Sequence, residues 1–184
     1  MNPMLPIAEI VANIGKAKPK LGETTLIAID GPSGAGKTTL ALKLQQELNA
    51  AEVIHMDDLY AGWKDSLSSE LYERISTQIL LPLSQNSLAR YQKFNWSRNS
   101  FDEWIELAEP RFLLLEGVGS AALQNRQWIS FSLFMDVSDR TGLERVRSRD
   151  GDAIAALIPD WQIMQRQHFE EHQTKEYADM VLSV

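Results

Sequence analysis

The sequence predicts an α/β domain in which helices cover both faces of an open, mainly parallel, five-stranded sheet. Five short segments are apolar at nearly every position, as is typical of parallel strands that are covered on both faces. Segments with helical spacing of apolar residues lie between them, and this alternation is the pattern of successive strand–helix–strand units. We expect residues 1–184 to form a single domain, because a chain of this length can bury a substantial core.

The predicted strands and helices alternate along most of the chain. The strands are residues 25–30, 51–57, 112–117, 131–138 and 178–184. The helices are residues 38–48, 69–81, 101–107, 140–149 and 161–175. The gap between the second and third strands is too long for a simple crossover. Because ligands bind at the carboxyl ends of such strands, we expect residues 59–110 to form a substrate-side insertion.

Residues 1–20 are predicted to form a helical extension at the N-terminus. Apolar residues at positions 7, 10, 11 and 14 follow helical spacing, with Pro6 near the start and Gly15 at the end. We expect this helix to pack on the domain. The alternative is that it forms the contact between two copies of the chain in a homo-oligomer.

Charge and cysteine content narrow the function classes. The net charge of -7 argues against binding to nucleic acid or to acidic membranes, because a protein that binds a phosphate backbone needs a basic face. Without cysteine, the chain forms neither disulfides nor thiolate metal sites. No apolar run is long enough to span a bilayer, and the N-terminus lacks the features of a signal peptide. We therefore expect a cytoplasmic protein with a small-molecule substrate.

The most specific feature is the segment GPSGAGKT, residues 31–38, which matches the phosphate-binding pattern G-x-x-x-x-G-K-[ST] in full. It follows a predicted strand and begins a predicted helix, as this motif requires. Its glycines allow backbone N–H groups to surround phosphate oxygens, and the helix N-terminus adds a positive partial charge. The motif predicts a nucleoside triphosphate site and the three-layer sandwich of P-loop NTPases.

Within this loop, Lys37 is expected to bind the β- and γ-phosphates, and the Thr38 hydroxyl is expected to bind Mg²⁺. The residues expected to contact the nucleotide, taken to be ATP, are Gly31, Ser33, Gly34, Ala35, Gly36, Lys37, Thr38 and Thr39. The loop alone fits kinases, GTPases, motor ATPases and transport ATPases, so other motifs must distinguish these classes.

Acidic residues follow the second and third predicted strands. Asp57 and Asp58 stand where a carboxylate binds Mg²⁺ or accepts a proton from a substrate hydroxyl. The alternative is that the pair caps the next turn. Glu116 ends the third strand and precedes a glycine. No N-K-x-D motif, which GTPases use to recognise the base, follows that strand.

The P-loop, the segment DDLY at residues 57–60 and the pair Glu116–Gly117 together resemble the uridine kinase and phosphoribulokinase superfamily of small-molecule kinases. The resemblance implies that Asp57 is the base toward the acceptor hydroxyl and lies near the metal. It also implies that Glu116 helps to hold Mg²⁺. Uridine kinases have the pattern D-x-F-Y, and in this chain Leu59 replaces the phenylalanine.

The segment YQKFNWSR, residues 91–98, resembles the Y-D-F-x-x-H-S-R segment that contacts the nucleoside in this superfamily. It keeps the first tyrosine and the final Ser-Arg pair, whereas Trp96 stands in place of the histidine. The residues expected in the acceptor site are Asp57, Tyr60, Trp63, Tyr91 and Arg98. Trp63 and Trp96 either stack on a planar substrate or have a structural role.

Residues 139–152 are predicted to form an arginine-bearing lid. The segment DRTGLERVRSRD resembles the R-x-x-R-D element of the same superfamily. Arg145 and Arg149 are the candidates to stabilise charge on the transferred phosphoryl group, in a site closed to water. The alternative is a solvated helix face whose arginines pair with Glu144 or Asp150.

The histidines and two further tryptophans are expected to have no catalytic role. His168 and His172 have the spacing of a metal-binding pair, but no third ligand stands nearby, so we expect them on a solvated helix face. His55 lies within a strand and is expected to be structural. Trp104 and Trp161 follow helical spacing with apolar neighbours and are expected in the core.

These motifs predict a Mg²⁺- and ATP-dependent transfer of a phosphoryl group to a hydroxyl of a small metabolite. A nucleoside is the favoured acceptor, and a sugar, a polyol or a vitamin precursor is the alternative within this class. A different alternative is a nucleotide-binding regulator or slow ATPase without an acceptor, which the departures in residues 91–98 favour. The net charge disfavours a kinase that acts on RNA or DNA ends.

Overall fold

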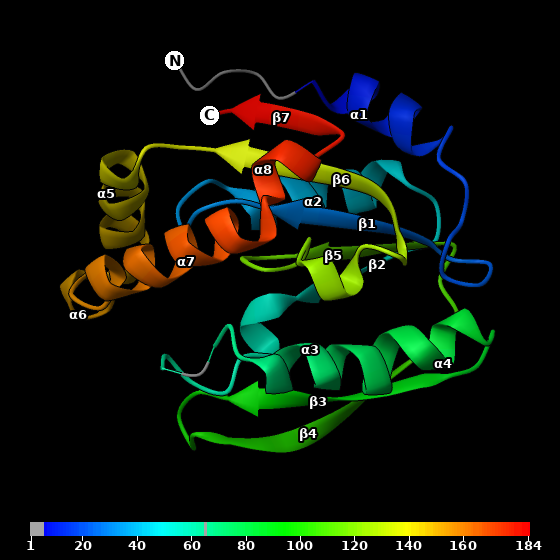
Figure 1. Ribbon diagram of the computed structural model, residues 1–184, viewed down its shortest axis with the longest axis horizontal. Coiled ribbons are helices and arrows are strands. Elements are labelled where there is room, and N and C mark those ends of the chain that lie inside the picture. Colours follow the sequence, from blue (N-terminus) through cyan, green and yellow to red (C-terminus); the bar gives the residue numbers. More distant parts are fainter. Residues whose placement is uncertain (1–5, 65) are drawn as a thin grey trace.

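The main sheet has five parallel strands in the order β2, β5, β1, β6, β7 (Figure 1). The computed structural model describes residues 6–64 and 66–184, so the first five residues of the predicted extension and position 65 of the insertion lie outside the described residues. The strands are β1 (Thr25–Asp30), β2 (Ala51–His55), β5 (Phe112–Glu116), β6 (Ile129–Asp136) and β7 (Met180–Ser183). Each neighbouring pair is parallel, which confirms the predicted sheet.

Helices cover both faces of this sheet, because successive residues of its strands point to opposite faces and are apolar on both. Ile27 and Ile29 of β1 pack with α1 and α2, whereas Leu26 and Ala28 pack with α3 and α7. The predicted three-layer sandwich is therefore confirmed (Figure 1). The helices are α1 (Ile7–Ile14), α2 (Lys37–Glu47), α3 (Ser69–Ile75), α4 (Leu81–Ser84), α5 (Asp139–Asp150), α6 (Asp152–Ala155), α7 (Ile158–His172) and α8 (Thr174–Tyr177).

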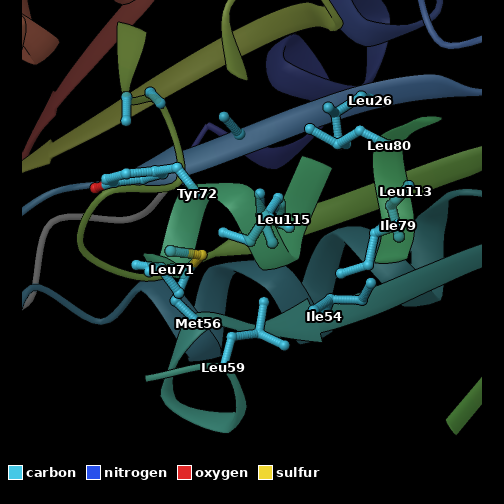
Figure 2. Close-up of a cluster of buried hydrophobic side chains, with 14 of the residues drawn as sticks. Leu26, Ile54, Met56, Leu59, Leu71, Tyr72, Ile79, Leu80, Leu113 and Leu115 are labelled. Atoms are coloured by element: carbon cyan, nitrogen blue, oxygen red, sulfur yellow. The ribbon is translucent and has the colours of Figure 1, made fainter. Parts of the chain in front are cut away.

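The larger of two apolar clusters joins the sheet to the insertion. Figure 2 shows Leu115 of the sheet near Leu71 and Tyr72 of α3, and Leu26 of the sheet beside Leu80 of the insertion. On the opposite face, α1 packs on the sheet through the fully buried Ile10 and, together with α2, belongs to the second cluster. The N-terminal helix thus packs on the domain, as expected.

The insertion combines a helical segment with an antiparallel hairpin. α3 continues through a π-helical turn (Ser76–Leu80) into α4, and the strands β3 (Ala89–Asn95) and β4 (Ser100–Leu107) follow. The hairpin lies along the outer side of this helical segment (Figure 1). The hairpin forms a separate two-stranded sheet, and Lys93 of β3 contacts Asp58 in the turn after β2.

The helix predicted over residues 101–107 is wrong, because this segment forms β4. Phe101, Ile105 and Leu107 face inward with the spacing of a strand, whereas Trp104 is 51% exposed. A window this short fits both periods, and pairing with β3 decides between them. Trp104 is therefore not in the core; its ring lies beneath the guanidinium of Arg90, 5.6 Å from the ring centroid.

The C-terminal part follows the predicted pattern with one interruption. The helix predicted at 140–149 is α5, and Trp161 of α7 is buried as expected. The long helix predicted at 161–175 ends at His172, where Gln173 adopts a left-handed backbone conformation before α8 begins. Among the described residues, no helix has both the length and the apolar character needed to cross a membrane.

His168 and His172 lie on the buried face of α7 and not on a solvated one, which corrects the expectation from sequence. Their ring centroids are 4.1 Å apart, and the Tyr72 ring stacks on His168. The backbone N–H of Leu123 donates to Nδ1 of His172 at 3.1 Å. Within residues 6–64 and 66–184, no group of three or more metal-ligating side chains forms. Burial, together with the positive charges of His172 and Arg126, lowers the pKa of His168 to about 3.

This burial predicts that acid weakens the fold through His168. The unfolded chain binds a proton at this residue as the pH falls below 6.5, whereas the folded chain does so only near 3. The stabilising contribution is present above pH 6.5 and is lost as the pH falls, reaching about 2 kcal/mol of loss by pH 5. In urea denaturation, His168→Gln should therefore flatten the dependence of the unfolding free energy on pH in this window.

His55→Gln is the matched control. The hydrogen bond with Glu116 raises the pKa of His55, so this residue stabilises the fold below pH 6.5 and loses that contribution as the pH rises through its raised pKa. The two variants should change the pH dependence in opposite directions. An unchanged slope in His168→Gln would contradict the burial argument.

Candidate functional site

The P-loop, residues 31–38, follows β1 directly and is closed around the ammonium group of Lys37. Gly31, Gly34 and Gly36 have φ angles of 135°, 78° and 90°, which residues with a side chain rarely adopt. Nζ of Lys37 donates to the carbonyl oxygens of Gly31 at 2.7 Å and Pro32 at 2.8 Å. This cation therefore lies at the mouth of the loop and at the N-terminus of α2.

Asp30, the last residue of β1, is fully buried and connects the loop to the segment after β5. Its carboxylate accepts hydrogen bonds from the backbone N–H groups of Gly31 at 2.8 Å, Gly119 at 3.1 Å and Ala121 at 3.0 Å. Burial raises the pKa of Asp30 to about 6, against the opposing effects of these N–H groups and of Lys37. No sequence motif predicts a role for Asp30, although a single acidic residue at the end of an apolar strand is a signal that could have identified it.

The predicted lid helix α5 rests on the P-loop through two glycines. A Cβ atom on Gly34 would lie 2.3 Å from the carbonyl oxygen of Gly142, and one on Gly142 would lie 2.4 Å from that of Ser33. Nη1 of Arg145 donates to the carbonyl oxygen of Gly34 at 3.2 Å. Arg145 therefore contacts the backbone of the loop, and α5 is anchored there.

Glu116, at the end of β5, holds the loop from the other side. Its Oε1 atom accepts a hydrogen bond from Oγ1 of Thr38 at 2.9 Å and lies 2.5 Å from Nδ1 of His55. The parallel register of β2 and β5 places His55 opposite Glu116. The hydrogen bond and the charge of Glu116 raise the pKa of His55, and partial burial opposes the effect. His55, expected to be structural, thus orients the carboxylate of a predicted metal ligand.

The two aspartates after β2 have different surroundings. Asp57 shares a pocket with Lys37 and Glu116, whereas Asp58 forms an ion pair with Lys93 of β3 at 3.1 Å. Asp57 is exposed and lines the pocket. Desolvation by the neighbouring protein atoms raises the pKa of Asp57, Lys37 opposes the effect, and Glu116 adds to it. Of the two aspartates, Asp57, to which the resemblance assigns the base role, is therefore the one that lines the pocket.

Lys37 lies among negatively charged side chains. Burial lowers the pKa of Lys37, and the negative charges of Glu116, Asp30 and Asp57 oppose this effect. The ammonium group therefore has three carboxylates near it and two carbonyl oxygens as direct partners.

The pocket has a volume of about 570 Å³ and extends from the P-loop across the carboxyl ends of β2 and β5. It is lined by loop residues, carboxylates, the ends of α5, α6 and α7, and aromatic side chains. The lining residues are Ser33, Gly34, Gly36, Lys37, Thr38, Thr39, Asp57, Tyr60, Trp63, Ser66, Trp96, Glu116, Gly117, Val118, Val146, Arg149, Asp150, Ile154, Ile158 and Trp161.

Four of these side chains, Tyr60, Trp63, Trp96 and Trp161, form an aromatic wall. Ring centroids lie 5.6 Å apart for Trp63 and Trp96, 6.1 Å for Trp63 and Trp161, and 5.5 Å for Tyr60 and Trp161. Nε1 of Trp96 donates to the backbone oxygen of Asp57 at 2.9 Å, which holds this ring beside the carboxylate. The wall therefore begins next to Asp57.

α7 contributes contacts that sequence analysis missed. Nε1 of Trp161 donates to Oγ of Ser33 at 2.7 Å, and Oε1 of Gln165 accepts a hydrogen bond from the backbone N–H of Ser33 at 3.1 Å. The sequence holds no motif for this arrangement, because the two segments are far apart in the chain. Trp161 thus joins the aromatic wall to the P-loop.

Two predicted acceptor residues lie elsewhere. Tyr91 is buried in β3, which raises its pKa to about 12, and Arg98 is exposed and paired with Asp102 at 3.1 Å. Neither lines the pocket. Arg149 does line it, and its guanidinium makes two hydrogen bonds to Asp150, at 2.8 and 2.7 Å. Of the two candidate lid arginines, Arg149 is therefore the one that reaches the pocket.

Comparison with known proteins gives matches in structure only. No family model matches the chain, and no curated protein matches its sequence. A possible uridine kinase from Bacillus stearothermophilus has a TM-score of 0.68 at 20% identity, over 96% of each chain. A candidate fructose transport system kinase from Silicibacter sp. TM1040 has a TM-score of 0.72 at 21% identity, over 97% of this chain and 99% of that one. The chain has the P-loop kinase fold.

A more distant match supports the same conclusion. A candidate P-loop kinase with a circular permutation, from Saccharomyces cerevisiae, has a TM-score of 0.55 at 8% identity over 97% of each chain. At sequence identities of 8–21%, these comparisons establish the fold alone, and the activity depends on the residues of the pocket.

The contact of α5 with the loop predicts that Gly142→Ala weakens nucleotide binding. Alanine favours a helix by about 1 kcal/mol, yet its Cβ would lie 2.4 Å from the carbonyl oxygen of Ser33 and would displace α5 or the loop. We expect at least a roughly tenfold loss of affinity for a non-hydrolysable Mg-ATP analogue in isothermal titration calorimetry, that is, about 1.4 kcal/mol.

Ser148→Ala is the matched control, because Ser148 is an exposed residue of the same helix. It changes helix propensity without meeting the loop and should bind the analogue as the wild type does. Wild-type affinity in Gly142→Ala would contradict the proposed contact.

Proposed function

We propose that this chain is a Mg²⁺- and ATP-dependent phosphotransferase that moves the γ-phosphoryl group to a hydroxyl of a small metabolite. The observation that carries the proposal is the common pocket of Lys37 and Asp57, with the aromatic wall beyond them. A nucleotide hydrolase needs only a water molecule next to the phosphates. A carboxylate followed by a large aromatic surface suits a second, organic substrate.

In this proposal, the P-loop binds the phosphate donor, ATP. Its backbone N–H groups and the N-terminus of α2 bind the phosphates, and Lys37 exchanges its contacts with loop carbonyls for phosphate oxygens. Arg149, at the pocket end of α5, adds positive charge where the transferred group carries negative charge.

The residues around Thr38 fit a magnesium ion. Mg²⁺ prefers oxygen ligands, and a hydroxyl and a carboxylate meet here within hydrogen-bonding distance. Thr38 and Glu116 would hold the ion, with Asp57 on the same side of the pocket. The ion would neutralise phosphate charge during transfer.

Asp57 acts on the acceptor as the general base. The acceptor oxygen forms a bond to the γ-phosphorus as the bond to the β-phosphate oxygen breaks, ADP leaves, and the hydroxyl proton passes to the Asp57 carboxylate. Partial desolvation favours this role, because it raises the pKa of Asp57 and makes the carboxylate a stronger base.

Within this class, a nucleoside is the favoured acceptor, and a sugar, a polyol or a vitamin precursor is the alternative. The uridine-kinase-like motifs and the planar rings beside Asp57 support a nucleoside. The structural neighbour from Silicibacter is described as a fructose transport system kinase, and this description supports a sugar as the acceptor. A nucleotide-binding regulator without an acceptor is the rival from another class, and it offers no role for the aromatic wall.

Asp57→Asn tests the role of the base. We expect turnover at saturating ATP to fall about 10²- to 10⁴-fold, since the general base is lost, while the affinity for Mg-ATP stays within about twofold, as P-loop contacts dominate that binding. Acceptor-dependent ADP release and calorimetry measure the two quantities.

Asp58→Asn is the matched control, because the adjacent carboxylate pairs with Lys93 on the rim and should leave turnover nearly unchanged. Lys37→Ala should abolish turnover and retain the fold by circular dichroism. A turnover number in Asp57→Asn equal to that of the wild type would rule out the base role.

A further inference from the structure

We propose that the acceptor is an alcohol with a flat or apolar body and no negative charge, and that the pocket excludes phosphorylated and carboxylated alcohols. This inference rests on the proposed phosphotransferase function and specifies its acceptor class. It comes from the distribution of charge around the pocket, together with the aromatic wall.

Both cations among the described lining residues lie on the donor side. Lys37 is part of the P-loop, and Arg149 projects from α5 and is paired with Asp150. When the triphosphate binds, its phosphate oxygens pair with these two cations. They are therefore not free to recognise an anion on the acceptor.

The acceptor side offers a carboxylate and aromatic rings. Asp57 lies there together with the four rings of the aromatic wall and the hydroxyl of Ser66. The Tyr60 hydroxyl already donates to the backbone oxygen of Val118 at 2.8 Å, and the Ser66 hydroxyl donates to that of Gly62. The rings thus provide apolar contact and stacking surfaces.

Cations of the insertion that lie near this side are committed to protein partners. Lys93 pairs with Asp58 at 3.1 Å. Nη2 of Arg74 donates to the backbone oxygen of Leu59 at 2.8 Å, and its guanidinium lies 4.6 Å from the centroid of the Phe101 ring.

Two further insertion cations point to other surroundings. Arg98 pairs with Asp102 at 3.1 Å on the exposed end of the hairpin. Lys64 lines a separate cavity, which Glu171 and His172 also line. Recruiting any of these four cations for an anionic substrate would break an existing contact or require a movement of the chain.

An anionic acceptor would therefore meet the Asp57 carboxylate with no free cation beside it on this side of the pocket, among the described lining residues. Repulsion between like charges about 6 Å apart, at the effective dielectric of a partly buried site, lowers the rate roughly 100-fold. A neutral alcohol avoids this repulsion and gains contact with the wall. Exclusion of anions is thus a property of the site's charge and not of its size.

The test compares acceptors that share a body and a hydroxyl and differ in one anionic group. The pairs are uridine and uridine 3′-monophosphate, and 4-(hydroxymethyl)benzamide and 4-(hydroxymethyl)benzoate. ADP release is measured with Mg-ATP and the full chain, and an acceptor-free reaction gives the background. For each pair with activity, we expect kcat/KM to be at least about 100-fold higher for the neutral member.

A charge-introducing variant tests the cause. Trp63→Lys places a cation in the wall and should reduce the preference for the neutral member at least about tenfold. Trp104→Lys is the matched control, since Trp104 is exposed on β4 outside the pocket, and it should leave the preference unchanged.

The outcomes separate the two proposals. Acceptor-dependent release with anionic members equal to or better than their neutral partners overturns the acceptor class and leaves the phosphotransferase standing. A preference that Trp63→Lys does not change overturns the electrostatic explanation. Release that no acceptor stimulates, in a chain that binds Mg-ATP, overturns the phosphotransferase itself.

Discussion

The three hydrogen bonds that the Asp30 carboxylate accepts are the constraint on which the rest of the site depends. A fully buried carboxylate is costly unless its oxygens are paired, and here backbone N–H groups pair them from both the P-loop and the segment after β5. This connection fixes the P-loop relative to the strand end that carries Glu116. In the proposed reaction, the distance between the phosphates and the Glu116 carboxylate is therefore set before any ligand binds.

Two helices from the C-terminal part of the chain, α5 and α7, also stabilise the P-loop. α5 meets it backbone to backbone through Gly142, and α7 contacts Ser33 through Trp161 and Gln165. Since Trp161 is also part of the aromatic wall, the P-loop and the wall share a structural element. A loop held in this way loses little conformational freedom on binding, which favours affinity for a small ligand.

The sequence predicts the P-loop side of the pocket well and its aromatic side poorly, for a physical reason. The P-loop, the five strands and Glu116 depend on local patterns, namely a contiguous glycine-rich motif and apolar runs that end in a carboxylate. β4 was misassigned because its spacing fits two periods, and pairing with β3 decides the outcome. His55, Trp161 and Gln165 gain their roles only through contacts between distant segments, and Tyr91 and Arg98 keep the spacing of a motif without lining the pocket.

The fate of the γ-phosphoryl group tests the central claim most directly. Phosphorus NMR of a reaction with Mg-ATP and the neutral alcohols distinguishes a phosphate ester from inorganic phosphate. We predict a new phosphate monoester signal that grows in step with ADP and is absent without an alcohol. ADP accompanied only by inorganic phosphate, in equal amounts with and without every alcohol, would contradict a phosphotransferase and identify the pocket as that of an ATPase.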